Sequence, residues 1–192
     1  DALVAKMKPL IAKIKVGPGN ETGIMMGPLV THQHWEKVQS YIEQGKQEGA
    51  SLLVDGSQYK PEDNQNGFFM GCSLFDNVQP SMRIYKEEIF GPVLSVVRVP
   101  DFNSALLLIN DHEYGNGTAI FTRDGYTART FAEKVQVGMV GVNVPVPVPV
   151  AYHSFGGWKR SIFSDIGMYG HEAIRFYTKL KTITQRWFPR SA

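Results

Sequence analysis

The chain has 192 residues, of which 43% are hydrophobic, 20% charged and 11% aromatic. This composition is typical of an ordinary globular protein and excludes a disordered, collagen-like or disulfide-rich chain. The net charge of +2 gives no sign of a nucleic-acid partner.

The cysteine content and the lengths of the apolar runs predict the cellular compartment of the protein. Cys72 is the only cysteine, so no internal disulfide can form, and we expect a reducing, cytoplasmic compartment. Apolar runs such as 105–109 are far shorter than the roughly 18 residues that a membrane-spanning helix needs. We therefore expect no membrane partner. The chain begins at Asp1 without an initiator methionine, and we expect a fragment or a processed product.

The first half of the chain predicts helices followed by short strands. Apolar residues recur at helical spacing over 3–14, where Pro9 is expected to interrupt the helix. Thr31 is a suitable N-cap for an amphipathic helix, whose apolar face carries Trp35, Val38, Tyr41 and Ile42. Runs rich in β-branched and aromatic residues predict strands at 51–54, 68–75 and 93–99.

The second half of the chain alternates helices with strands. Asp101 can cap a helix that ends before Gly115, and a further helix is predicted at 126–135. Strands are predicted at 118–122 and 139–144. This alternation indicates an α/β fold with a mainly parallel sheet flanked by helices.

Two segments near the C-terminus have patterns of their own. The alternating prolines of 144–150 force an extended backbone and remove amide donors, so this stretch is expected to cross a surface and not to form a central strand. It opens a loop-rich segment at 144–170. The alternating pattern of 174–184 predicts an exposed strand that can pair with another chain.

Glu88 and Phe90 are the residues whose spacing suggests a nucleotide site. In an extended backbone, two residues separated by two project to the same side. A carboxylate can accept hydrogen bonds from both ribose hydroxyls while a flat ring packs against the sugar or the base. The alternative is that Glu88 is a solvated or salt-bridged loop residue and Phe90 belongs to the core.

The sequence contains no motif that predicts a metal site or another kind of catalytic site. The five histidines are scattered without the spacing of metal ligands, so no metal site is expected. Phosphate-binding loops, the dinucleotide fingerprint and the serine-hydrolase elbow are all missing. Cys72 lies in an apolar strand context and is expected to be an inert structural thiol.

Several motifs in a fixed order resemble one enzyme superfamily. The run Lys-Glu-Glu-Ile-Phe-Gly-Pro-Val at 86–93 resembles the Glu-Ile-Phe-Gly-Pro signature of the NAD(P)-dependent aldehyde dehydrogenase superfamily. Its further landmarks follow as Asn-x-x-x-Tyr-Gly at 110–115, Gly-x-Val-x-Val-Asn at 138–143, Phe-Gly-Gly-aromatic-Lys at 155–159 and a closing segment at 169–182. The resemblance implies that 1–192 is the C-terminal part of the catalytic domain, with an oligomerisation segment at 174–187.

The runs at 114–122, 140–147 and 180–187 are similar to the methylmalonate-semialdehyde dehydrogenases, the CoA-acylating branch of that superfamily. This resemblance implies NAD as cofactor, coenzyme A as co-substrate and a small aldehyde that is oxidised through a cysteine thioester to acyl-CoA with loss of CO2. It places the nucleophilic cysteine and the N-terminal dinucleotide-binding domain before Asp1, so the isolated chain is expected to be inactive. It also implies a homo-oligomer and, in a eukaryote, the mitochondrial matrix.

The resemblance assigns roles to individual residues. Glu88 would bind the nicotinamide-side ribose, with Phe90 beside it. Phe155 is the best candidate for a wall of the substrate tunnel, with Val150 and His153 as weaker candidates; that Phe155 is simply core is the alternative. The Glu that common members carry after the lysine of Phe-Gly-Gly-aromatic-Lys is missing, and the role of Asp165 stays open. A non-catalytic binding or assembly module with the same fold is the alternative to a dehydrogenase fragment.

Overall fold

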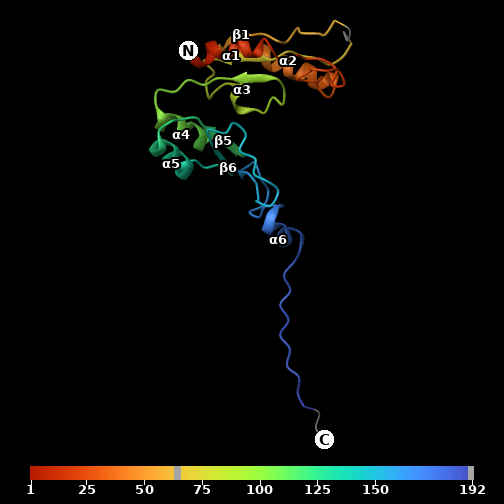
Figure 1. Ribbon diagram of the computed structural model, residues 1–192, viewed down its shortest axis with the longest axis vertical. Coiled ribbons are helices and arrows are strands. Elements are labelled where there is room, and N and C mark those ends of the chain that lie inside the picture. The colour runs from red at the N-terminus through yellow and green to blue at the C-terminus, as the bar shows by residue number, and fades with distance from the viewer. Residues whose placement is uncertain (63–65, 190–192) are drawn as a thin grey trace. The chain divides into compact units, whose positions relative to one another are not determined.

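The computed structural model describes residues 1–62 and 66–189. The chain divides into two compact units, unit 1 from Asp1 to Arg98 and unit 2 from Val99 to Ala192. Figure 1 traces their elements in chain order, from the red N-terminus to the blue C-terminus. No helix within the described ranges is long and apolar enough to cross a membrane.

Unit 1 combines helices with a three-stranded sheet. Its elements are α1 (Ala2–Ile11), α2 (His32–Gln47), β1 (Ser51–Val54), β2 (Ser73–Asp76), α3 (Arg83–Lys86) and β3 (Val93–Ser95). The central strand β2 pairs antiparallel with β1 and parallel with β3. The long connection from β2 to β3 contains α3 and the residues of the candidate site.

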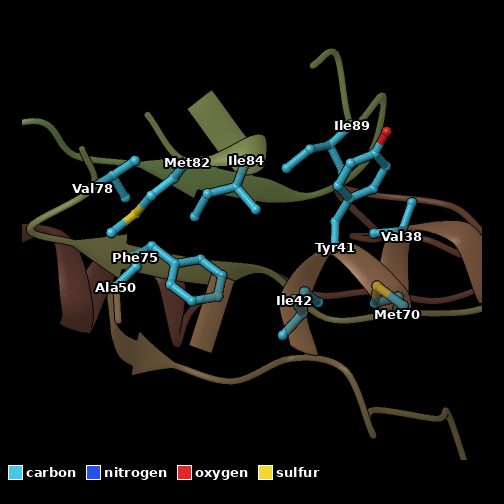
Figure 2. Close-up of a cluster of buried hydrophobic side chains, with 10 residues drawn as sticks. All are labelled: Val38, Tyr41, Ile42, Ala50, Met70, Phe75, Val78, Met82, Ile84 and Ile89. Atoms are coloured by element: carbon cyan, nitrogen blue, oxygen red, sulfur yellow. The ribbon is translucent and has the colours of Figure 1, made fainter. Parts of the chain in front are cut away.

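The amphipathic helix α2 carries much of the core of unit 1. The Thr31 hydroxyl accepts a hydrogen bond from the His34 amide, which caps the first turn as predicted. Val38, Tyr41 and Ile42 are buried against a cluster completed by Ala50, Met70, Phe75, Val78, Met82, Ile84 and Ile89. Figure 2 shows Tyr41 rising from α2 towards Ile89. The core therefore joins α2 to the connection between β2 and β3.

In unit 1, the predicted interruption of the first helix and the predicted lengths of two strands were wrong. Pro9 lies inside α1 and does not interrupt it, because a missing amide near the end of a short helix removes only one bond of the last turn. The apolar runs 68–75 and 93–99 form strands only over Ser73–Asp76 and Val93–Ser95. Phe69 and Met70 are buried without joining the sheet. Their apolar character reports burial and not strand pairing.

Unit 2 contains short paired strands and several helices. Its elements are α4 (Phe102–Asp111), β4 (Tyr114–Gly115), β5 (Gly117–Ile120), α5 (Gly125–Lys134), β6 (Met139–Val142), β7 (Trp158–Lys159), the 3-10 helix η1 (Gly170–Glu172) and α6 (Ala173–Tyr177). Strands β5 and β6 pair parallel, and β4 and β7 pair antiparallel. The core of this unit joins α5 to α4 through Phe131, Val135, Val137, Phe102, Leu106 and Ile109.

The α/β class is confirmed, and the parallel pairs lie where helices and strands alternate. The described strands form three separate sheets, β1–β2–β3, β4–β7 and β5–β6, in which the β1–β2 and β4–β7 pairs are antiparallel. The Asp101 cap and the helix predicted at 126–135 are also confirmed, the latter as α5. The proline-rich stretch 144–150 belongs to no strand of the described chain, as expected.

The strand predicted at 174–184 is wrong for its first residues. Ala173–Tyr177 form α6 instead, and 178–189 continue without regular structure and with exposed side chains. A strand is stabilised by a neighbour that pairs with it, and the alternating pattern alone supplies none.

Candidate cofactor site and substrate wall

The segment 84–91 packs along one stripe of α2. The stripe consists of His34, Val38, Tyr41 and Gly45, which helical geometry places on one face of α2. A Cβ atom added at Gly45 would lie 2.9 Å from Ile84 Cδ1, and one added at Gly91 would lie 2.7 Å from Val38 Cγ2. Both ends of the segment therefore approach α2 as closely as glycine permits.

Glu87, in the middle of this segment, is fully engaged within unit 1. Its carboxylate accepts a 2.5 Å hydrogen bond from the Tyr41 hydroxyl and a 2.7 Å charge-assisted bond from Arg83 Nε. The hydrogen bonds from Arg83 and Tyr41 hold the pKa of the Glu87 carboxyl below its usual range, and the same contact raises the pKa of Tyr41. Glu87 is thus a structural residue.

Glu88, the next residue, is exposed and makes no hydrogen bond or ion pair with any other residue that the structure describes. Ile89 is only 8% exposed and anchors the segment in the core. Two adjacent, exposed glutamates therefore differ in their partners: Glu87 is hydrogen-bonded to Tyr41 and Arg83, and the Glu88 carboxylate has no partner among the residues that the structure describes.

Phe90 is 73% exposed, so the alternative that it belongs to the core is wrong. Its φ of 55° lies in the left-handed region, which is unusual for a bulky residue. The argument from the sequence assumed an extended backbone through Phe90, and that assumption is wrong at Phe90. His34 Nε2 lies 2.7 Å from the Phe90 carbonyl oxygen, and the His34 ring meets the Phe90 ring edge-on at 6.3 Å between centroids.

An open apolar hollow of about 470 Å³ lies beside Phe90. Its walls are Met26, Gly27, Pro28, Leu29, Met70, Phe90, Gly91 and Pro92. An exposed ring at the wall of an apolar hollow suits a flat, partly apolar ligand group. The Glu88 carboxylate, two residues before Phe90, does not line the hollow. The exposed Glu88 carboxylate and Phe90 ring therefore remain candidates for contact with a nucleotide.

In unit 2, Phe155 lines a second hollow, of about 700 Å³. It is half-buried and stacks on Tyr169 at 4.9 Å between centroids, so it is neither a free ring nor a fully buried core residue. Asp165 lies on the same wall. Val150 and His153 do not line this hollow, and both are exposed. Of the three predicted substrate-site residues, Phe155 alone lines this hollow.

Sequence reasoning missed the role of the lysine in Phe-Gly-Gly-Trp-Lys. Lys159 Nζ donates to the carbonyl oxygens of Ile109, Asn110 and His112, at 3.1, 2.8 and 3.0 Å. These carbonyls lie at the C-terminal end of α4, which the ammonium group caps. The spacing of the motifs gave no sign of this contact, because Lys159 and Asn110 are 49 residues apart.

The asparagines of two motifs also hold backbone in place. The Asn143 side chain accepts from the Thr122 amide at 2.9 Å and donates to the Thr122 carbonyl at 3.0 Å, which extends the β5–β6 pairing beyond the strands. Asn110 donates to the Lys134 carbonyl and accepts from the Gln136 amide, so it fixes the end of α5. These two residues are structural.

Cys72 lies just before β2 and is partly buried. Burial raises the pKa of its thiol, because the charged thiolate is poorly solvated there. The thiol is therefore weakly nucleophilic, in agreement with the expectation of an inert, structural cysteine.

Comparison with known proteins decides the family. A profile described as the aldehyde dehydrogenase family matches residues 1–183. The chain belongs to the aldehyde dehydrogenase family. It is 60% identical over 192 residues to a malonate-semialdehyde dehydrogenase of Pseudomonas aeruginosa, with 100% of this chain and 39% of that protein covered. The chain thus spans about two fifths of the length of the curated relatives it matches.

Solved structures of aldehyde dehydrogenases share the fold. A methylmalonate-semialdehyde dehydrogenase of Oceanimonas doudoroffii is 59% identical with a TM-score of 0.94, over 98% of this chain and 39% of that one. A betaine aldehyde dehydrogenase double mutant of Staphylococcus aureus, in complex with NAD+, is 31% identical with a TM-score of 0.85, over 99% and 39%. The aldehyde dehydrogenase motifs of this chain divide into backbone supports, such as Asn143 and Lys159, and exposed groups, such as Glu88.

Proposed function

We propose that this chain is part of an NAD-dependent, CoA-acylating dehydrogenase that acts on malonate semialdehyde or its methyl derivative. In that enzyme it supplies part of the substrate wall and a cofactor clamp, which consists of Glu88 and Phe90. The observation that carries the proposal is the contrast between Glu87 and Glu88. The carboxylate of Glu87 accepts hydrogen bonds from Tyr41 and Arg83, whereas that of Glu88 is exposed and has no partner among the residues that the structure describes. The names of the relatives support the choice of aldehyde.

The two clamp residues have distinct tasks in this proposal. The Glu88 carboxylate accepts hydrogen bonds from the two hydroxyls of the nicotinamide-side ribose and so fixes its orientation. The exposed ring of Phe90 packs beside the sugar and shields it from water. When bound, NAD+ supplies the hydride acceptor of the oxidation.

Phe155 acts as a wall of the aldehyde site. Its stacking on Tyr169 fixes the plane of the ring, so it limits the width of the substrate without contributing a reactive group. The exposed positions of Val150 and His153 leave them at most a role at the mouth of that site.

The thiolate and coenzyme A complete the proposed reaction. Cys72 is a poor nucleophile because burial raises the pKa of its thiol, so the reactive cysteine lies in a part of the enzyme that this chain does not include. The isolated chain is then inactive. The overall reaction converts malonate semialdehyde, CoA and NAD+ into acetyl-CoA, CO2 and NADH, and the carbon, hydrogen and charge balance.

The C-terminal segment at 174–187 serves assembly in this proposal. Ile174, Leu180, Ile183 and Trp187 are all exposed apolar side chains, which a second copy of the enzyme would cover. The mass of the full-length enzyme in solution tests this part: a homo-oligomer is expected, and a strict monomer would contradict it.

The reaction is tested with the full-length enzyme, malonate semialdehyde, CoA and NAD+. We expect NADH and acetyl-CoA in equal amounts, measured by absorbance and by mass spectrometry. Formation of NADH with the free acid as product would overturn the CoA-acylating assignment. No NADH with any short aldehyde would overturn the dehydrogenase assignment itself.

A further inference from the structure

Phe90 has a conformation that requires support from outside its own segment. It is a bulky residue at φ 55°, and the residue is 73% exposed. Left-handed backbone is unfavourable for such a residue, since its Cβ approaches the neighbouring carbonyl oxygen. An exposed ring on a strained backbone can be held in one orientation only by contacts at the backbone or at the edge of the ring.

His34 makes both of these contacts. Its Nε2 lies 2.7 Å from the Phe90 carbonyl oxygen, and because a carbonyl can only accept, Nε2–H is the donor. The imidazole also meets the Phe90 ring edge-on, with 6.3 Å between centroids and 67° between planes. We propose that His34 is a positioning residue that holds Phe90 in the conformation in which it receives NAD, an inference that rests on the proposed function.

His34 is itself held in place by α2. Its amide donates to the Thr31 hydroxyl, which fixes the first turn of the helix. One turn further along the same stripe, Val38 lies against Gly91, the residue that follows Phe90. Phe90 is thus held on its own carbonyl and at the next residue by two positions of one rigid helix, so the strain at Phe90 is supported and the ring orientation is fixed before the cofactor arrives.

The test measures NAD binding to the full-length enzyme by calorimetry, with variants at His34, Gln33 and Phe90. His34→Ala removes the donor and the ring. His34→Phe keeps a ring and removes the donor, and His34→Gln restores an N–H donor of similar reach. We expect His34→Ala and His34→Phe to raise the dissociation constant of NAD about 3- to 10-fold, the scale of one hydrogen bond, and His34→Gln to stay within about twofold of the parent enzyme.

Gln33→Ala is the matched control, because Gln33 is exposed on the neighbouring position of α2. It should leave NAD binding and the KM for coenzyme A unchanged. A positioning role predicts that the His34 variants also leave the KM for coenzyme A unchanged. A loss of coenzyme A affinity equal to the loss of NAD affinity in both His34→Ala and His34→Phe would show general damage to the fold and overturn the inference.

Phe90→Ala separates this inference from the proposed function on which it rests. If Phe90→Ala weakens NAD binding while His34→Ala and His34→Phe bind NAD like the parent enzyme, the positioning role of His34 is wrong. The proposed role of Phe90 in NAD binding is then supported. If Phe90→Ala binds NAD like the parent enzyme, the proposed role of Phe90 is wrong. Weaker binding in Phe90→Ala, His34→Ala and His34→Phe, with rescue by Gln, supports both.

Discussion

The hydroxyl of Tyr41 donates a 2.5 Å hydrogen bond to Glu87, the residue directly before Glu88. Tyr41 is 2% exposed and lies in the middle of α2, 46 residues before Glu87 in the sequence. The contact ties the start of the proposed cofactor clamp to the centre of the core. The position of Glu88 is therefore set by the packing of unit 1 and not by the loop that carries it.

Tyr41→Phe should loosen this tie without opening the core, because only the hydroxyl is removed. We expect NAD binding by the full-length enzyme to weaken about 3- to 10-fold, which is less than the tenfold or more of a hydrogen bond to a charged group, because Tyr41 acts on the clamp only through Glu87. The pKa of Glu87 should rise, since the Tyr41 hydrogen bond is one of the causes that lower it. Ser40→Ala, which removes an exposed local bond to the Lys37 carbonyl, is the control. Equal NAD affinity in the Tyr41→Phe variant and the parent would contradict the link.

Phe155→Ala should widen the substrate wall. We expect kcat/KM to shift in favour of bulkier aldehydes by about 10-fold, the effect of a few methylene groups in an apolar pocket. Val150→Ala and His153→Ala serve as comparisons, because neither residue lines the hollow, and both should leave the preference unchanged. An equal loss on small and bulky aldehydes in Phe155→Ala would show damage to the fold and no role in selectivity.

Asn143 combines two hydrogen bonds to the Thr122 backbone with a φ of 58°. Asn143→Gly loses the two bonds, at about 1 kcal/mol each. Asn143→Ala loses them and adds left-handed strain of about 1 kcal/mol. Urea unfolding of the full-length protein should therefore rank the parent above Asn143→Gly and Asn143→Gly above Asn143→Ala. Finding Ala as stable as the parent would show that the motif asparagine does not support the backbone.

Asp76 and Arg98 form a two-pronged ion pair in unit 1, at 2.8 and 2.7 Å. The hydrogen bonds from Arg98 hold the pKa of Asp76 below its usual range. The folded state therefore binds fewer protons than the unfolded state, and the pair stabilises the fold above the ordinary aspartate pKa of about 3.9. That stability is lost as the pH falls through the lowered pKa. Asp76→Asn should reduce the difference between the urea midpoints at pH 7 and pH 3, and an undiminished difference would contradict the assignment.

Local signals in the sequence were sufficient for the helix starts. Thr31 and Asp101 bond amides three residues ahead, so the pattern that names the cap also contains its partner. Apolar runs were less informative, because Phe69 and Met70 are buried beside β2 and not in it. A hydrophobic run records burial, and strand pairing needs a neighbour that the run does not reveal.

The candidate site was predictable in part. The Glu88 and Phe90 pair was visible as a spacing, but the left-handed turn at Phe90 was not, because its support comes from His34, 56 residues away. The triple contact of Lys159 with the end of α4 was hidden for the same reason. Contacts of this range depend on how α2 and α4 pack, which no local pattern encodes.

The most direct test of the proposed cofactor clamp compares Glu88→Gln with Glu87→Gln in the full-length enzyme, by NAD dissociation constant and urea midpoint. Glu88→Gln should weaken NAD binding by roughly 10-fold, the scale of a lost charge-assisted interaction, and leave the midpoint unchanged. Glu87→Gln should lower the midpoint, because Arg83 and Tyr41 lose a charged partner. An unchanged NAD dissociation constant in Glu88→Gln would contradict the account.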